Sequence, residues 1–255
     1  MAEQGSIRVG LIKAVPVKWE IEANWRLFES LALRAVNRGA ELICTPECFL
    51  DGYVAPDREN WSEDKFRAIA QKVPDGLYIE KLRDFSRRNG VWVVFGFTEL
   101  NEDGCSNAAI LVDGSGDIRG IYRKTHLLDH DTVYRPGQDL PVWDTPFGKI
   151  GIMICADRRW PETARTLRVR GARLIMNPTY GMHHLDNEWW MRTRSYENEA
   201  YICFTHTEVA LVTDPGGGIA AKLVSSLPDV LVHDIDISNL PDEMYRHRRP
   251  DVYEI

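Results

Sequence analysis

The sequence contains little cysteine, no long apolar run and no excess of positive charge. Its five cysteines, an odd number scattered over 255 residues, are unlike the framework of a small secreted disulfide protein, so reduced thiols are expected. No window approaches the roughly 20 apolar residues of a membrane span, and the first residues lack a positive segment followed by an apolar core. These absences predict a cytoplasmic protein with no membrane partner.

The net charge and the spacing of possible metal ligands exclude two further classes. A formal net charge of -7 gives no electrostatic reason to bind nucleic acid, which attracts basic patches. Cys44 and Cys48 form a close pair, but no second Cys or His pair follows at zinc-ligand spacing. The tandem His183 and His184 are expected to cap or flank a following helix. A small-molecule partner and no metal are therefore predicted.

Apolar runs alternate with helical periods early in the chain, and hairpin signals dominate later. Apolar side chains at intervals of three and four from Ile21 to Val36 indicate one helix face, and "DGSG" at 113–116 is the strongest turn signal. Further helices are expected at about 79–90, 161–171 and 185–198, and a second hairpin turn at 146–148. We predict a mixed sheet covered by helices, in one domain spanning 1–255 with a core over about 7–236 and a tail over 237–255.

Three reactive side chains lie at or just beyond the ends of apolar runs: Glu47, Lys124 and Cys155. Each taken alone is explained as well by a solvated carboxylate, an exposed lysine or a packed thiol. Together they suit acyl transfer, because a thiol attacks as thiolate, a carboxylate takes its proton, and an ammonium group favours both that ionisation and an oxyanion. A histidine base, from His126, His183 or His184, stays open.

Several short motifs occur in the order found in the nitrilase, or carbon–nitrogen hydrolase, superfamily, and the chain resembles that family from Ile7 to about Asp236. The motifs are "PECF" followed by "GY", "YRKTHL", "YRPG", "GIMICADRRWPE", "MNPT" and "YENEAY". The resemblance implies an α/β fold, the four-layer αββα sandwich of the nitrilase type. It also implies a Glu47, Lys124 and Cys155 triad that works without cofactor or metal, in a homodimer or larger homo-oligomer.

The resemblance further implies hydrolysis of an amide, a nitrile or an N-carbamoyl compound through a cysteine thioester. Glu47 would deprotonate Cys155 and later pass the proton to the leaving amine, while Lys124 and the backbone N–H of Ala156 would hold the oxyanion. One feature departs from the family pattern. Many members carry a second glutamate in the loop after the lysine, where this chain offers Asp129, His130 and Asp131.

The residues after the nucleophile point to the substrate. "DRRWPE" is similar to the corresponding stretch of N-carbamoyl-D-amino acid amidohydrolases, whose paired arginines bind a carboxylate, so Arg158 and Arg159 are expected to bind a substrate carboxylate. An ion pair with a nearby acid such as Glu162 is the alternative for one of them. The resemblance also places four residues in the pocket: Tyr53, His126, Thr179 and Tyr180.

The predicted function is therefore cleavage of a non-peptide carbon–nitrogen bond in a small substrate that carries a carboxylate. An omega-amidase or nitrilase-type specificity is the near alternative. The missing loop glutamate also motivates a catalytically weak member that acts as a binding or assembly protein. Transfer of the acyl group to an acceptor other than water uses the same thioester.

Overall fold

Two six-stranded mixed sheets form the centre of the molecule in the computed structural model, which describes residues 5–181 and 184–253. In the first sheet, β1, β2 and β3 run parallel to one another, and β12, β4 and β5 add antiparallel strands at the two sides. Its strand order is β12 (Asp229–Asp236), β1 (Ser6–Lys13), β2 (Leu42–Cys44), β3 (Trp92–Asn101), β4 (Gly104–Val112) and β5 (Ile118–Arg123).

The second sheet repeats this plan. Strands β7, β8 and β9 are parallel, and β6, β10 and β11 are antiparallel to their neighbours. Its strand order is β11 (Ile219–Val224), β10 (Val209–Thr213), β9 (Tyr201–Thr205), β8 (Leu174–Pro178), β7 (Gly148–Ile152) and β6 (Val142–Thr145). The expectation of mixed sheets is confirmed.

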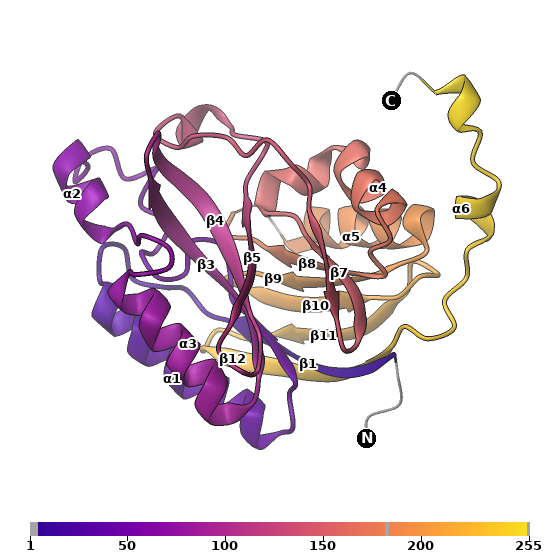
Figure 1. The fold of residues 1–255 in the computed structure, drawn as a ribbon, viewed down its shortest axis with the longest axis horizontal. Coiled ribbons are helices and arrows are strands. Elements are labelled where there is room, and N and C mark those ends of the chain that lie inside the picture. Colours follow the sequence, from indigo (N-terminus) through magenta and orange to yellow (C-terminus); the bar gives the residue numbers. More distant parts are fainter. Residues whose placement is uncertain (1–4, 182–183, 254–255) are drawn as a thin grey trace.

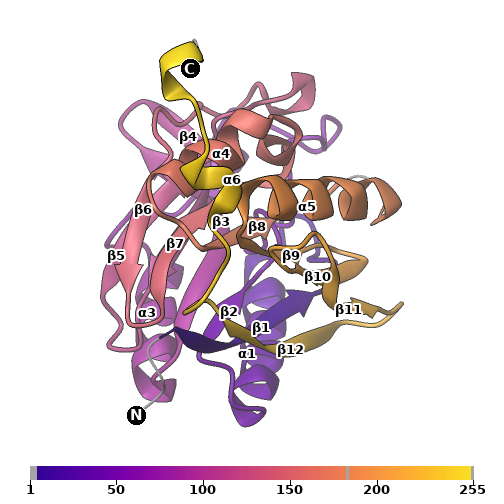
Figure 2. The same ribbon diagram turned by 90° about the vertical axis from the view of Figure 1, so that its right-hand side faces the viewer.

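Helices cover the outer face of each sheet, which gives four layers (Figures 1 and 2). On the first sheet lie α1 (Ile21–Asn37) and α3 (Leu77–Asn89), and on the second α4 (Pro161–Val169) and α5 (His184–Asn198). A third apolar cluster, with Leu11, Val94 and Ile152, fills the space between the sheets. The αββα sandwich implied by the family resemblance is thus confirmed.

Local sequence signals explain most of these elements. The predicted face of α1 is buried, including Trp25, Phe28 and Leu31. Gly90 ends α3 in the left-handed conformation (φ 62°), which glycine adopts without steric cost. Both predicted hairpins form, β4 with β5 and β6 with β7. The sequence signals did not predict α2 (Glu63–Ile69), a short helix with its N-cap at Ser62.

The last described residues follow β12 and run past the starting end of β8 to reach α5 (Figures 1 and 2). They contain α6 (Glu243–Arg246) and a short 3-10 helix, η3 (Pro250–Val252). The buried carboxylate of Glu199 accepts hydrogen bonds from the backbone N–H groups of Met244 and Tyr245, at 3.0 and 3.1 Å. The predicted single domain, with a core to about residue 236 and a tail over 237–255, stays a prediction.

Candidate functional site

The three reactive side chains come from the ends of three strands. Glu47 lies just after β2, Lys124 directly follows β5, and Cys155 opens the 3-10 helix η2 (Cys155–Arg159) after β7. The first two belong to one sheet and the third to the other. Nζ of Lys124 lies 2.9 Å from Oε1 of Glu47, and both side chains have no exposed surface.

The Glu47 carboxylate is held on both of its oxygens. Oε1 accepts hydrogen bonds from Nζ of Lys124 and from Nδ2 of Asn107, at 2.9 and 2.8 Å. Oε2 accepts one from the backbone N–H of Tyr180 at 3.0 Å. Oε2 has one hydrogen-bond donor among residues 5–181 and 184–253, and a carboxylate oxygen can accept two, so it has a free position with respect to these residues. This oxygen is therefore the one able to take a proton.

Lys124 has a second carboxylate partner, Asp131, in the loop where the family resemblance implies a glutamate. Asp131 closes a 3-10 turn, η1 (Asp129–Asp131), and its Oδ2 lies 2.7 Å from Nζ of Lys124. Its Oδ1 accepts the hydroxyl of Tyr53 at 2.6 Å. Burial lowers the pKa of Lys124, but the charges of Glu47 and Asp131 outweigh it and hold that pKa well above its usual value.

Cys155 occupies a strained backbone conformation at the start of η2. Its φ is +47°, in the left-handed region that costs a residue with a Cβ about 1–3 kcal/mol. Its side chain is buried beside the apolar cluster between the sheets. Burial, followed by the Glu47 charge, raises the pKa of the Cys155 thiol, while the charges of Lys124 and Arg158 act in the opposite direction. The resting thiol therefore keeps its proton at neutral pH, and a base is needed to release it.

Arg158 lies fully buried, close enough to Cys155 for its charge to act on the thiol. Its Nη2 donates to Oδ1 of Asn187 at 2.7 Å and to the Gly181 carbonyl at 3.4 Å. Its guanidinium carbon lies 5.2 Å from the centre of the Trp190 ring. Within residues 5–181 and 184–253, no carboxylate lies at ion-pair distance from Arg158. In the same part of the chain, Nε and Nη1 of Arg158 and Nδ2 of Asn187 are buried without an oxygen or nitrogen acceptor, and the Arg158 side chain also donates to the Cys155 sulfur, which lowers the pKa of that thiol.

The other predicted site residues lie around this centre. The rings of Tyr53 and Tyr180 pack together with their centroids 5.1 Å apart. The Tyr53 hydroxyl donates to Asp131, and the Tyr180 backbone N–H donates to Glu47. Ala156 follows Cys155 in η2 and is buried. The guanidinium carbon of Arg159 lies 5.6 Å from the centre of the Trp190 ring, which Arg158 also approaches.

Two further predicted pocket residues, Thr179 and His126, contact residues outside the predicted triad. The tandem histidines are described only in part. Thr179 is fully buried, and its Oγ1 lies near the carbonyl and side-chain oxygens of Asn177. His126 is about one third exposed, and its Nδ1 lies 2.8 Å from Oδ1 of Asp157. His183 falls outside the described residues, and His184 begins α5. In the described part of the chain, no three His, Cys, Asp or Glu side chains are placed to hold a metal ion.

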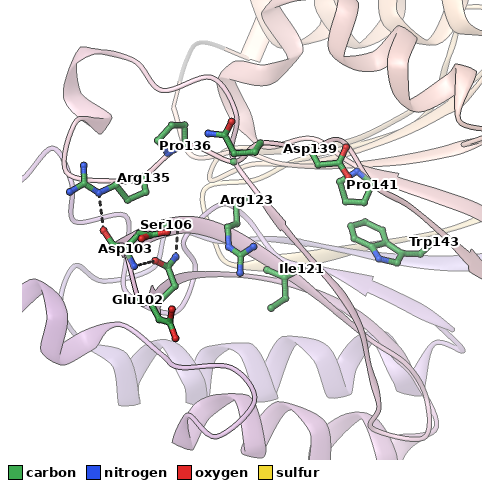
Figure 3. A pocket seen from close by; sticks show the side chains of 13 residues that line it. Glu102, Asp103, Ser106, Ile121, Arg123, Arg135, Pro136, Asp139, Pro141 and Trp143 are labelled. Carbon is green, nitrogen blue, oxygen red and sulfur yellow. Dashed lines mark hydrogen bonds between the residues drawn. The ribbon is translucent and has the colours of Figure 1, made fainter.

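A surface hollow of about 600 Å³ lies on the reverse face of the strands that carry the site (Figure 3). Ser106 and Arg123 line it, whereas their neighbours Asn107 and Lys124 turn toward Glu47. Successive side chains of a strand point to opposite faces, so the two features are separated by the sheet itself. The hollow contains none of the three predicted reactive residues.

Sequence signals missed two residues that the structure brings to the centre, and they did not distinguish a third from its neighbours. Asn107 lies in the middle of β4 and gave no motif, yet it donates to Glu47. Asp131 was one of three candidates in an irregular loop. Asp157 stands in "CADRRWPE", two residues after the candidate nucleophile, but its burial is a property of the fold that the sequence does not show.

Comparison with known proteins assigns the family. The carbon–nitrogen hydrolase family model matches residues 8–241. A nitrilase of Pyrococcus abyssi is 37% identical over 174 residues, which is 68% of this chain and 64% of that protein. A deaminated glutathione amidase of Dictyostelium discoideum is 28% identical over 92% of this chain and 91% of its own length.

Solved structures agree on the fold. The NitFhit protein of Caenorhabditis elegans superposes with a TM-score of 0.85 at 25% identity, covering 98% of this chain and 66% of that one. An amidase of Nesterenkonia sp. AN1, carrying the acetamide moiety of fluoroacetamide on its active-site cysteine, superposes with a TM-score of 0.84 at 22% identity, covering 99% and 97%. By the match of its sequence to the family model over most of its length, this chain belongs to the carbon–nitrogen hydrolase family.

Proposed function

We propose that this protein hydrolyses an amide-type carbon–nitrogen bond of a small substrate, with Cys155 as nucleophile, Glu47 as general base and acid, and Lys124 as oxyanion ligand. The observation that carries the proposal is the buried contact of Lys124 with Glu47, beside a thiol presented by a strained backbone. Burial of two charges lowers the stability of the folded state unless the charges are paired and hydrogen-bonded. Their presence beside a nucleophile is more readily explained by chemistry than by stability.

Acylation begins with transfer of the Cys155 proton to Oε2 of Glu47, the oxygen with a free acceptor position. The sulfur then forms a bond to the substrate carbonyl carbon, and the C=O electron pair moves onto oxygen. Lys124 and the N–H of Ala156 stabilise this oxyanion. Collapse of the tetrahedral intermediate breaks the carbon–nitrogen bond, Glu47 returns the proton to the leaving nitrogen, and a thioester remains on Cys155.

Deacylation uses the same carboxylate with water as nucleophile. Glu47 takes a proton from water, the oxygen attacks the thioester, and the sulfur leaves with the proton that Glu47 carries. The hydrogen bonds from Lys124, Asn107 and Tyr180 hold the Glu47 carboxylate in one orientation during both halves. Asp131 serves in place of the loop glutamate, because it shares the Lys124 ammonium with Glu47.

We infer that the substrate also carries a carboxylate, and the buried donors of Arg158 and Asn187 support this. A guanidinium offers a planar fork that matches a carboxylate, and a buried donor without an acceptor costs about 1–3 kcal/mol until it is satisfied. An N-carbamoyl amino acid or the monoamide of a dicarboxylic acid fits this requirement. One relative, from Francisella tularensis, is named a citrullinase, and citrulline carries both a carbamoyl group and a carboxylate.

Turnover tests the proposal directly. Purified protein is screened for ammonia release from carbamoyl amino acids, omega-amides, simple aliphatic amides and nitriles. Cys155→Ala, Glu47→Gln and Lys124→Met should each abolish release, and Cys105→Ala, a change at another buried thiol, should leave it intact. Arg158→Met should raise KM at least about tenfold for substrates with a carboxylate, since charged hydrogen bonds contribute about 1.5–3 kcal/mol, and by much less for simple amides. Because the Arg158 charge also lowers the pKa of the Cys155 thiol, kcat should fall for both substrate classes.

Two outcomes would overturn parts of the proposal. Activity retained by Cys155→Ala on every substrate that the wild type cleaves would exclude the thioester route. A strong preference for nitriles would replace the amide assignment with a nitrilase-type specificity.

The homo-oligomer implied by the resemblance is a further part of the proposal, and light scattering on the eluting chromatography peak tests it.

A further inference from the structure

The side chain of Asp157 forms an unusually dense set of hydrogen bonds for a residue outside the predicted triad. It has no exposed surface and lies two residues after Cys155 in η2. Its Oδ2 accepts from the backbone N–H of Ile154 at 2.8 Å and from the hydroxyl of Tyr122 at 2.6 Å. A buried carboxylate needs such partners, because an unpaired buried charge is strongly destabilising.

The second oxygen of Asp157 binds the segment that follows Lys124. Oδ1 accepts from Oγ1 of Thr125 at 2.9 Å and from the backbone N–H of His126 at 2.9 Å, and Nδ1 of His126 lies 2.8 Å away. The His126 ring stacks on Trp160, with centroids 4.2 Å apart and planes inclined by 10°. The ring that contacts Asp157 is therefore itself packed against a second ring.

These partners belong to both sheets. Tyr122 is in β5 and Thr125 lies just beyond it, on either side of Lys124, whereas Ile154 immediately precedes Cys155 after β7. One carboxylate thus joins the end of the strand that presents the ammonium to the end of the strand that presents the thiol. The two strands lie in different sheets and share no backbone ladder.

We propose that Asp157 is a positioning residue that sets the distance between Cys155 and Lys124 by tying the ends of β7 and β5 together. The effect of Asp157 on catalysis rests on the proposed function. The tie, which is the set of hydrogen bonds that join the two strand ends through Asp157, does not depend on that proposal. Asparagine at this position keeps one acceptor oxygen and turns an amide N–H₂ toward groups that are themselves donors. The two strand ends then lose a common partner, and a displacement of about 1 Å at a reacting group can cost about 100-fold in rate.

The test compares three variants: Asp157→Asn, Tyr122→Phe and Asp113→Asn. Tyr122→Phe removes one hydroxyl and keeps the ring, so it carries the test if Asp157→Asn does not fold. Asp113→Asn is the matched control, since Asp113 also accepts two backbone N–H groups, from Ser115 and Asp117 at 2.8 and 2.9 Å, but in the turn between β4 and β5.

Two measurements are made on each variant. Hydrogen exchange followed by mass spectrometry should show faster exchange in both 122–128 and 153–160 for Asp157→Asn and Tyr122→Phe, and wild-type exchange in both for Asp113→Asn. Steady-state kinetics on the best amide should show kcat lowered about 100-fold by Asp157→Asn and about threefold to tenfold by Tyr122→Phe, with KM within about threefold of wild type. A purely structural role would lower the folded fraction and leave kcat per folded molecule unchanged.

The outcomes separate the two proposals. If the wild type turns over no carbon–nitrogen substrate, the proposed function fails, and faster exchange in both segments still supports the tie. If exchange rises in one segment alone, or in neither, the tie is refuted whatever the activity. Wild-type kcat in Asp157→Asn would refute the positioning role while leaving the proposed function in place.

Discussion

Replacing Lys124 with methionine should destabilise the folded protein strongly, because it leaves two buried carboxylates without their cation. Nζ lies 2.9 Å from Glu47 and 2.7 Å from Asp131, and all three side chains lack exposed surface. Methionine retains most of the apolar stem, so the change removes charge with little change in packing. Loss of one partner from a buried ion pair costs about 3–5 kcal/mol, and we expect a decrease of this size in the unfolding free energy.

A second substitution makes the reasoning specific. Asp131→Asn added to Lys124→Met removes one of the two carboxylates left unpaired, so the double variant should be more stable than the sum of the single changes predicts, by about 1–3 kcal/mol. Lys149→Met is the control, because that lysine is 45% exposed and pairs with Asp144, which is 83% exposed. An exposed pair contributes up to about 1 kcal/mol, so this variant should stay within that range of wild type.

Urea unfolding at pH 7.5, followed by tryptophan fluorescence, measures five proteins: the wild type, Lys124→Met, Asp131→Asn, the double variant and the control. The pKa of Lys124 is raised in the folded state, so its stabilisation is fully present below the unfolded-state pKa of about 10.4 and is lost only as the pH rises through the folded-state value. The whole effect is therefore visible at pH 7.5. A loss below about 1 kcal/mol in Lys124→Met, or strict additivity with Asp131→Asn, would refute this account of the buried charges.

Three further predictions concern the core and the site. Burial raises the pKa of Cys44 to about 12, so above about pH 8.5 the unfolded chain loses a proton that the folded state keeps. The unfolding free energy then falls by about 1.4 kcal/mol per pH unit for this thiol. Cys44→Ala should remove that share of the decrease in unfolding free energy between pH 7.5 and 9.5, and a decrease equal to that of the wild type contradicts the prediction. Phe28→Ala should cost about 3–5 kcal/mol in urea unfolding, because Phe28 is fully buried with ring centroids 5.1 and 4.9 Å from Phe85 and Phe95, while kcat per folded molecule stays at the wild-type value. Tyr53→Phe should cost about 1–3 kcal/mol by leaving the Asp131 oxygen without its donor, and an unchanged urea midpoint would show that this hydrogen bond contributes nothing.

Elements set by nearby residues could be predicted from the sequence. The period of α1, the glycine after α3 and the "DGSG" turn each act over a few residues, so the pattern contains the information. The exception, α2, is only seven residues long and has two buried side chains, Phe66 and Ile69. A helix that short shows less than two full turns of its period, and packing rather than propensity stabilises it.

The partners of the site could be predicted only where a family motif marked them. Glu47, Lys124 and Cys155 stand in motifs, whereas Asn107 and Asp131 are chosen by geometry. Asn107 lies 60 residues from the carboxylate it binds, and its neighbour Ser106 would be an equally plausible donor from sequence alone. The strand alternation decides between them, and the alternation is fixed by the register of β4 against β3 and β5.

The site also depends on how two sheets are held together. Glu47 and Lys124 end strands of one sheet and Cys155 ends a strand of the other, so no backbone ladder sets their separation. The apolar cluster between the sheets resists their separation, but a hydrophobic contact is not directional and tolerates small sliding motions. Directional contacts between the sheets are needed at the strand ends. The hydrogen bond from Tyr180 to Glu47 is one, and the bonds from Tyr122 and Thr125 to Asp157 are others. Because these contacts surround the three reactive side chains, the precision of the site follows from polar groups that the hydrophobic pattern of the sequence does not reveal.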